Sequence, residues 1–320
     1  MSDVIASPDG FPQPAKDTTT VVDEPIDLTV VIVSFNDGDW LERCLQAAFG
    51  RAGAIRVDVV IVDNGADGAH TLVRRPFAGV RVLQTENRGF ANGNNVALMS
   101  GTARHVLFLN PDTELVEGSL ADLLAALDDR PEVGLIGVRQ VTAEGTLWPT
   151  IRYFLNVGRE LNRVLYARET ECDWTSGSFM LARREALLSA GLFDERFVLY
   201  SEEPDRCLRI KRADWSVRHL PEMTIVHHAG KGGTRPTMTA QDAFTRRQYA
   251  QKHFGTPHRI AYLAAVGVGH LLRAVFYGRG RSPEGRRAAR LALRTLCGRA
   301  DAPFGPPPPI AFPRSRRRAG

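Results

Sequence analysis

Cysteine is scarce in this sequence: a chain of 320 residues contains four, Cys44, Cys172, Cys207 and Cys297. They form no Cys-x-x-Cys pair, and none combines with histidine at the spacing of a zinc site. This pattern excludes a disulfide framework and a structural zinc site. It is typical of reduced thiols in a cytosolic protein.

Long hydrophobic runs are also missing. The first residues, MSDVIASPDGFPQPAKD, have neither the basic region nor the apolar core of a secretory signal. The most apolar stretch, 260–277, is interrupted by His270 and Arg273 and falls short of the ~20 residues that a spanning helix needs. We therefore expect a protein that stays in the cytoplasm and does not cross a membrane.

Each end of the chain nearly lacks charge of one sign. Residues 1–27 contain one lysine and six acids, whereas residues 258–320 contain thirteen arginines and two acids. The basic character therefore belongs to the C-terminal segment and concerns binding partners rather than the fold. No nucleic-acid partner is expected, because this segment has no interleaved aromatic residues and no binding motif.

Apolar runs and helical patterns alternate through the first half of the chain. The strand-like runs are LTVVIVS (28–34), VDVVIVD (57–63), VRVLQ (80–84), HVLFLN (105–110) and VGLIGV (133–138). Helical patterns lie between them, at 39–49, near 92–103 and at 121–129. The alternation predicts an α/β fold with a mostly parallel sheet and flanking helices. The glycine- and aromatic-rich stretch 174–200 is expected to form loops rather than another repeat of the sheet.

We divide the chain into four parts by composition. Residues 1–26 are expected to be a disordered leader, and 27–257 the main α/β domain. Residues 258–302 are expected to form an amphipathic, basic helical extension, and 303–320 a disordered Pro/Arg tail.

Polar clusters follow three of the predicted strands. They are Ser34-Phe35-Asn36, Asp63-Asn64-Gly65 and Asn110-Pro111-Asp112. Ligands of open α/β sheets bind at the carboxyl ends of the strands, so these clusters are candidate binding residues. Asp63 is suited to accept from a nucleobase or a ribose hydroxyl, and Asp112 to ligate a hard divalent cation. A turn or helix cap is the alternative for any single one of them.

A glycine- and asparagine-rich segment, 87–95, precedes the second helical pattern. Its glycines permit close backbone approach, and Arg88 provides a charge suited to a diphosphate. The spacing is neither a P-loop nor a GxGxxG motif, so a capped loop before a helix is the alternative.

Two further clusters lie in the second half. Glu202-Glu203-Pro204-Asp205 places carboxylates side by side, which raises their pKa values and suits a general base. A solvated acidic helix start is the alternative. His227-His228, followed by a Gly/Lys loop, can supply a metal ligand and a phosphate contact.

Taken in order, these clusters resemble the inverting nucleotide-sugar glycosyltransferase family 2, especially its rhamnosyltransferase-like branch. The matching segments are VVIVSFN (30–36), VVIVDNG (59–65), ENRGFANGNN (86–95), LFLNPDTEL (107–115), DWTSGSFMLARREAL (173–187), 191–221 and VHHAGKGG (226–233). The resemblance covers residues 28–235. It implies a GT-A fold, a Rossmann-like central sheet with an acceptor half built onto it.

The resemblance also implies roles for individual residues. Asp63 looks like the reader of the pyrimidine base, and Glu203 like the catalytic base. Asn110-Pro111-Asp112 takes the place of the family's DxD motif, with Asp112 and His227 as ligands of Mg²⁺ or Mn²⁺ and His228 as the alternative ligand. The remaining implied substrate contacts are Ser34, Asn36, Asn64, Arg88, Gly89, Asn94, Asn110, Trp174, Gly177, Glu202, Asp205 and Lys231.

One departure from the family pattern concerns the base. The usual E-D-x-D here reads Glu202-Glu203-Pro204-Asp205, so the base has one more methylene than aspartate. A catalytically inactive homologue that still binds nucleotide sugar is therefore an alternative. A sugar nucleotidyltransferase or a dinucleotide-dependent dehydrogenase is disfavoured, because no glycine-rich phosphate loop follows residues 28–34.

The predicted reaction is metal-dependent, inverting transfer of a sugar to an acceptor hydroxyl. The branch implies dTDP-L-rhamnose as donor, with UDP-galactofuranose, UDP-GlcNAc and UDP-glucose as alternatives. The expected acceptor is a lipid-linked or cell-envelope glycan, which is an intermediate of polysaccharide and cell-wall synthesis. The basic C-terminal segment predicts peripheral contact with the cytoplasmic face of the membrane. Packing of 260–277 on the catalytic domain is the alternative.

Overall fold

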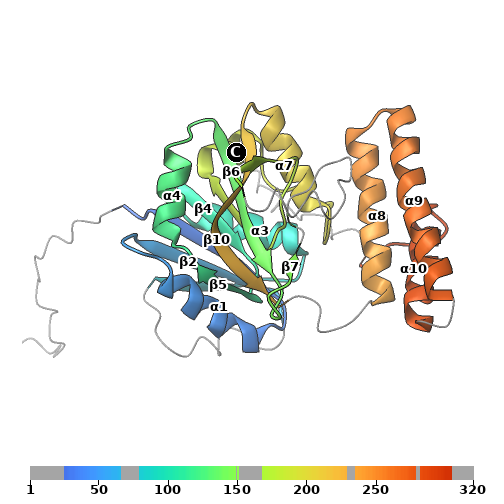
Figure 1. Ribbon diagram of the computed structural model, residues 1–320, viewed down its shortest axis with the longest axis horizontal. Helices are drawn as coiled ribbons and strands as arrows, with labels where there is room; N and C mark the ends of the chain where they lie inside the picture. Colours follow the sequence, from blue (N-terminus) through green and yellow to red (C-terminus); the bar gives the residue numbers. More distant parts are fainter. Residues whose placement is uncertain are drawn as a thin grey trace, which may run out of the picture.

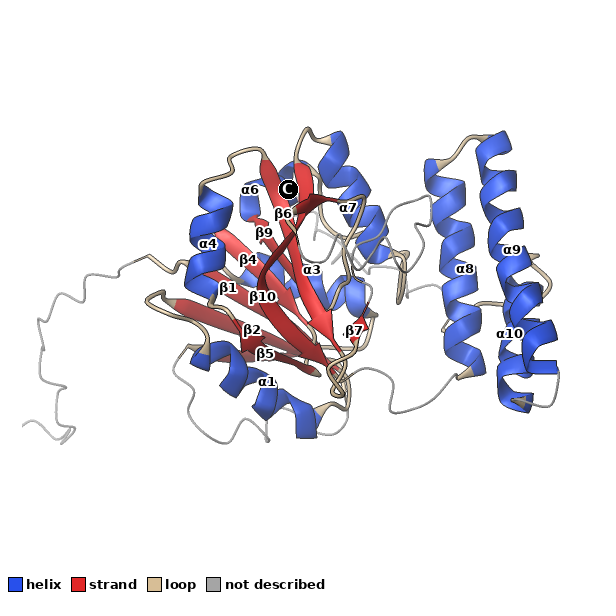
Figure 2. Ribbon diagram, in the orientation of Figure 1, coloured by secondary structure: helices blue, strands red, loops and turns tan. Residues whose placement is uncertain are grey.

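The computed structural model describes residues 25–65, 79–148, 150, 168–228, 235–278 and 282–304. A ten-stranded mixed sheet runs through an α/β body, and helices cover both of its faces (Figures 1 and 2). Three further helices stand together at one side of this body. All four cysteines are free, as predicted, and Cys297 is the exposed one among them.

Four parallel strands form the N-terminal half of the sheet. They are β1 (Leu28–Ser34), β2 (Val57–Asp63), β3 (Val80–Gln84) and β4 (His105–Leu109), in the order β3-β2-β1-β4. The helices α1 (Gly38–Gly50) and α3 (Phe90–Ser100) connect them. These elements confirm the predicted alternation. β3 differs from β1 in burial, because it lies at the sheet edge and its side chains are half-buried or exposed.

The other half of the sheet is mixed. Its elements are β5 (Thr113–Glu117), α4 (Leu120–Asp128), β6 (Val133–Val141), β7 (Leu147–Trp148), β8 (Thr170–Glu171), β9 (Phe179–Arg183), α6 (Arg184–Ser189), α7 (Glu202–Arg212) and β10 (Ser216–His227). β9 lies antiparallel between β4 and β6. The stretch 174–200, expected to be loops, therefore contributes a buried central strand. The apolar run FMLAR (179–183) was the feature of the sequence that could have predicted this strand.

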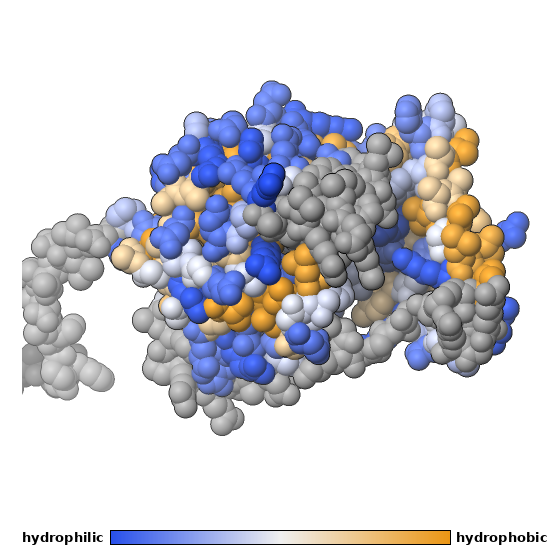
Figure 3. Space-filling view, in the orientation of Figure 1, coloured by the Kyte–Doolittle hydropathy of each residue, from blue (hydrophilic) through white to orange (hydrophobic). Residues whose placement is uncertain are grey.

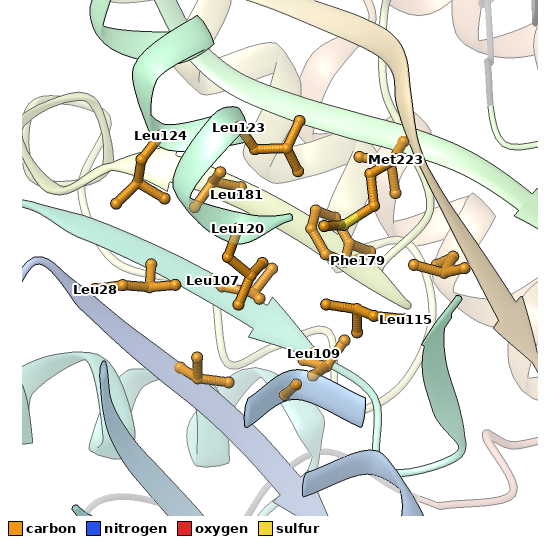
Figure 4. Packing of buried hydrophobic residues seen from close by; sticks show 14 of the residues in the cluster. Leu28, Leu107, Leu109, Leu115, Leu120, Leu123, Leu124, Phe179, Leu181 and Met223 are labelled. Atoms are coloured by element: carbon orange, nitrogen blue, oxygen red, sulfur yellow. The ribbon is translucent and has the colours of Figure 1, made fainter. Parts of the chain in front are cut away.

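Side chains of the sheet alternate between two apolar cores, because successive strand residues point to opposite faces. On one face Val30 and Ile32 pack with residues of α1 and α4, and on the other Val31 packs with residues of α3, α6 and α7. Figure 4 shows Leu120 and Leu123 of α4 in the same cluster as Phe179 of β9. The two cores hold the carboxyl ends of β1, β2 and β4 at one edge of the sheet.

The C-terminal helices are α8 (Pro236–His253), α9 (Thr256–Gly278) and α10 (Pro283–Leu296). α8 and α10 pack together through Ala243, Ala292 and Leu296, with Leu263 and Val266 of α9 against them. The helical extension predicted for 258–302 is thus present as α9 and α10, and α8 joins the same bundle (Figure 2). Within the described residues, no helix is sufficiently long and apolar to span a bilayer.

Candidate active site

The ends of β1 and β2 bring the first two polar clusters together. Ser34 and Asp63 are partners in the parallel register, and the Asn64 N–H donates to the Ser34 carbonyl over 2.9 Å. Both side chains are buried, and an Asp63 oxygen accepts from the Gly65 N–H. Asn36 is exposed at the same edge in a left-handed conformation, with φ 60°. The strand order reverses at β1, because β2 and β3 lie on one side of it and β4 on the other. Ligands of such sheets usually bind at the point of reversal, beside the carboxyl ends of the strands.

A second pair forms across the sheet at Asp112 and His227. The Asp112 Oδ1 and His227 Nε2 atoms are 3.1 Å apart, and both side chains remain partly exposed. The pairing of β5 with β10, which sets Thr113 opposite His227, holds the two residues together. Buried Gln140 of β6 contacts the other ring nitrogen, with 2.6 Å between its Nε2 and His227 Nδ1. Gln140 in turn accepts from the Ser178 hydroxyl.

The neighbouring His228 points elsewhere. Its ring stacks on Trp40 of α1 with a centroid separation of 4.4 Å, and its Nε2 lies 2.8 Å from Glu114 Oε1. Glu114 also binds Arg43. Because consecutive residues at a strand end project to opposite sides, only His227 faces Asp112. The geometry therefore favours His227 over His228 as the ligand.

The residues at this pair suit a hard divalent cation. Two donor atoms 3.1 Å apart match the separation of adjacent ligands, about 3 Å when each bond is near 2.1 Å. The carbonyl oxygen of the Asn110 side chain is buried with no hydrogen-bond partner. The carboxylate of Asp112 and the imidazole of His227 would leave positions for diphosphate oxygens and water. No group of three His, Cys, Asp or Glu residues suited to a metal occurs in the described residues.

Glu203 lies in the first turn of α7. Its Oε1 accepts from the Gly177 N–H over 3.3 Å, and a Cβ at position 177 would meet that oxygen at 2.7 Å. Gly177 thus contacts the predicted base, and its lack of a side chain makes the contact possible. Burial raises the pKa of Glu203, while hydrogen bonds from backbone N–H groups oppose the rise.

Glu202, the adjacent acid, is more deeply buried, and its Oε2 has no hydrogen-bond partner. Burial and then the charge of Glu203 raise its pKa well above the usual value. Both pKa values are thus raised, with burial as the first cause, and only that of Glu202 is also raised by its neighbour. The residues before the helix, Tyr200 and Ser201, both adopt left-handed φ angles of 70° and 68°, which are costly for residues other than glycine.

Asp205 has an environment that differs from its predicted role. Its carboxylate is fully buried and binds Arg209, Lys252 and His253, the last at 2.7 Å. Burial alone would raise the pKa of Asp205, but the hydrogen bond from His253 and the two cations lower it. The contacts indicate an anchor between α7 and α8 rather than a substrate contact.

The segment before α3 is held mainly by protein contacts. Gly89 has φ 97°, and a Cβ there would meet the Val198 carbonyl at 2.5 Å, so this position requires glycine. Asn94, predicted to bind substrate, is buried, and its side-chain nitrogen donates to the Phe90 carbonyl. These contacts give Asn94 a structural role. Arg88 is half-buried at the start of this segment.

Three other predicted residues complete the comparison. Trp174 is half-buried against the apolar core on the α7 side of the sheet. Asn64 is buried and accepts from the Thr85 hydroxyl over 2.7 Å. Lys231 lies outside the described residues. Gln140, Trp40 and the α8 partners of Asp205 were not predicted, because their contacts join elements far apart in the sequence.

Comparison with known proteins agrees with this geometry. Residues 29–191 match the sequence profile of Glycosyl transferase family 2. The N-acetylglucosaminyl-diphospho-decaprenol L-rhamnosyltransferase of Mycobacterium tuberculosis is 29% identical over 263 residues, covering 71% of this chain and 85% of that protein. Rhamnosyltransferase WbbL of Escherichia coli is 22% identical over 221 residues, covering 62% and 83%.

Solved structures show the same fold. The mannosyltransferase PcManGT from Pyrobaculum calidifontis, in complex with GDP-Man and Mn²⁺, aligns with a TM-score of 0.57 at 18% identity, over 87% of this chain and 88% of that one. TarS 1-349 of S. aureus, in complex with UDP-GlcNAc, aligns with a TM-score of 0.52 at 14% identity, over 85% and 92%. The chain belongs to glycosyl transferase family 2 and is a glycosyltransferase of GT-A fold.

Proposed function

We propose that this protein transfers L-rhamnose from dTDP-L-rhamnose to a hydroxyl of a polyprenyl-linked glycan, with inversion at the anomeric carbon. The observation that carries the proposal is the difference between two carboxylate environments, those of Glu203 and Asp112. Glu203 has a raised pKa and a backbone donor, as a general base requires, whereas Asp112 faces His227, as a metal pair requires. The two relatives compared above are named as rhamnosyltransferases, which supports rhamnose as the sugar.

In the proposed mechanism, Glu203 accepts the proton of the acceptor hydroxyl. The resulting oxygen nucleophile forms a bond to the anomeric carbon while the bond from that carbon to the diphosphate oxygen breaks. The electron pair leaves with the nucleoside diphosphate. Asp112, His227 and Asn110 would hold Mg²⁺ or Mn²⁺, which supplies positive charge to the departing diphosphate. Asp63 would accept from the base or ribose of the nucleotide at the end of β2.

The base assignment is tested with Glu203→Gln and Glu203→Asp. Glutamine keeps the shape but cannot accept the proton, so turnover should fall by about 10²–10⁴-fold while donor binding persists. Aspartate restores the family's usual residue and should retain far more activity than glutamine. Near-normal turnover of a folded Glu203→Gln protein would remove Glu203 from this role. Product anomeric configuration, read by NMR, tests inversion separately.

The donor is tested by thermal shift with nucleotide sugars, with and without Mn²⁺. A ligand that binds the native state raises the melting temperature in proportion to RT ln(1 + [L]/Kd). A metal-dependent shift with dTDP-L-rhamnose that exceeds the shifts with UDP-sugars is expected. A larger shift with UDP-galactofuranose, UDP-GlcNAc or UDP-glucose would identify that sugar nucleotide as the donor instead of dTDP-L-rhamnose. Binding without turnover of any donor would identify an inactive homologue.

We also propose that the enzyme works at the cytoplasmic face of the membrane through its basic C-terminal segment. The supporting facts are the excess of arginine after residue 258 and the decaprenol-linked acceptor in the relative's name. A polyprenyl chain is insoluble in water, so its glycan is accessible only at the bilayer surface.

A further inference from the structure

α9 has an apolar face that the described part of the chain leaves uncovered. Its large hydrophobic side chains that are more than half exposed are Ile260, Val268, Leu271, Leu272 and Val275. Only six other large hydrophobic residues in the described chain are exposed, and they are scattered over the other elements. Figure 3 shows hydrophobic surface gathered over α9 at one side of the molecule.

Helical geometry puts these residues on one stripe. At about 100° per residue, the five side chains fall within an arc of roughly 120° along nearly the whole helix. The exposed alanines Ala261, Ala264 and Ala265 fill the stripe between them. No charged residue lies within this arc. We call these eight residues the α9 face.

The apolar residues on the opposite side of α9 are accounted for by packing within the bundle. Leu263 and Val266 pack on the cluster formed by α8 and α10, and His270 is buried. Packing within the bundle therefore accounts for these residues and not for the α9 face. A contiguous exposed stripe of this kind marks an interaction surface.

Charge identifies the partner. Exposed Arg287, Arg290 and Arg294 lie on the neighbouring α10, whereas Arg259 and Arg273 project from the side of α9 opposite the apolar arc. Residues 256–304 contain no lysine and only two acids, Glu284 and Asp301. A second copy of the chain would bring two basic segments together. Anionic lipid headgroups would neutralise them, and arginine stems can reach such headgroups while their methylenes stay in contact with apolar surface.

We propose that the α9 face lies in the headgroup region of an anionic lipid bilayer, with the helix parallel to the membrane. The proposal deepens the function proposed above, because it specifies the surface that meets the membrane. α8 joins α9 to the catalytic helix, since Lys252 and His253 bind Asp205 of α7. A membrane-bound α9 would therefore hold Glu203 at a constant distance from the lipid surface.

The experiment is vesicle flotation of the full chain with the double variant Leu271→Gln/Leu272→Gln. The matched control is Met99→Gln/Leu188→Gln, which removes two similarly exposed apolar side chains on α3 and α6. Wild type and control should float with vesicles that contain phosphatidylglycerol, and binding should weaken as salt rises. The α9 variant should bind at least about tenfold more weakly, because each leucine contributes apolar burial in the lipid. Circular dichroism melting verifies that every variant is folded.

Three results would overturn the proposal. The first is a wild-type protein that does not bind these vesicles, and the second is an α9 variant that binds like wild type. The third is a dimer that light scattering shows to dissociate in the α9 variant while vesicle binding is unchanged, since α9 would then join two copies. Sugar transfer to a water-soluble acceptor should be equal in all these proteins. Its absence in wild type would contradict the proposed function and leave the vesicle result to decide the surface.

Discussion

At the scale of single residues, neighbouring side chains have separate tasks because their contacts differ. Glu202 and Glu203 are adjacent, yet Glu203 receives a backbone hydrogen bond and Glu202 has a buried oxygen without one. His227 faces Asp112, whereas His228 stacks on Trp40. Tertiary contacts thus give the two glutamates different environments, and they do the same for the two histidines.

Gly177→Ala should lower turnover without unfolding the protein. The added Cβ would meet the Glu203 carboxylate at 2.7 Å, so the base must move. We expect a loss in kcat of at least about tenfold and little change in donor affinity, since misplacement of a reacting group by 1 Å costs up to 10². Gly255→Ala, at a position with nothing within 4 Å, is the control. Full activity in Gly177→Ala would mean that this contact does not orient the base.

Glu202→Gln should stabilise the protein, and more so at alkaline pH. The pKa of Glu202 is raised by burial and by Glu203, so the folded state keeps a proton that the unfolded chain releases. The wild type therefore loses stability as pH rises from the unfolded pKa towards the folded one. Melting temperatures at pH 5 and pH 8 should show a larger gain for the variant at pH 8. The same gain at both values, or an equal effect of Glu86→Gln on the surface, would contradict this.

Gln140→Leu should weaken binding of Mn²⁺ in the presence of nucleoside diphosphate. Gln140 contacts the Nδ1 atom of His227 and so holds the imidazole ring in place. Loss of such a partner of a metal ligand typically reduces metal affinity by 10–100-fold. Titration of free Mn²⁺ by electron paramagnetic resonance measures the affinity without any turnover. Gln46→Leu on the exposed side of α1 is the control. Unchanged affinity in folded Gln140→Leu would show that His227 needs no such support.

At the scale of elements, α7 depends on α8 for its position. The Ser201 hydroxyl donates to Thr245 of α8, and Asp205 binds the last turn of the same helix. These contacts lie on either side of Glu203. They also restrain the left-handed residues Tyr200 and Ser201, whose conformation the local sequence does not favour.

Asp205→Asn should therefore reduce both stability and kcat. The pKa of Asp205 is lowered in the fold, so its ion pairs stabilise the protein above the unfolded pKa and lose that contribution as pH falls through the folded pKa. The difference in melting temperature from wild type should be large at pH 7 and shrink towards pH 3. Lys252→Met, which removes one of three partners, should have a smaller effect. A difference independent of pH would rule out the ion-pair explanation.

At the scale of the whole molecule, the C-terminal helices form one bundle. Ion pairs and a hydrogen bond between α8 and α7 connect this bundle to the α/β body. The predicted boundary at 257/258 falls just inside α9, whereas α8 belongs to the bundle and contacts α7 as well. Family 2 similarity extends over residues 29–191, so the bundle and the base helix both lie beyond the matched segment.

Leu296→Ala should lower stability by roughly 2–5 kcal/mol in a single unfolding transition. Leu296 of α10 packs in the cluster that joins α10 to α8, and removing its methyl groups leaves a cavity. Because α8 is bonded to α7, we expect the bundle and the α/β body to unfold together in calorimetry. Leu293→Ala, half-buried on the same helix, should cost less. Two separate transitions would show that the bundle unfolds on its own.

The sequence by itself determined the α/β class, the strands β1, β2 and β4, and the polar clusters at their ends. Apolar runs and helical periodicity are local signals, and each strand is buried on both faces. The ordered motifs around Asp63, Asp112, Glu203 and His227 indicated the family before any contact was known. Lys231 lies outside the described residues, and the roles of the other site residues stay predictions.

Only the tertiary structure decided which residues support those motifs. The stretch 179–183 became a central antiparallel strand because it pairs with β4 and β6, and both partners are distant along the chain. Asp205 became an anchor and Asn94 a structural residue because their partners face them only after folding. Likewise, α9 has apolar residues around much of its circumference, and packing against α8 and α10 covers Leu263 and Val266 but leaves the α9 face exposed. Periodicity shows how residues are arranged along one element, but burial depends on which other elements cover them.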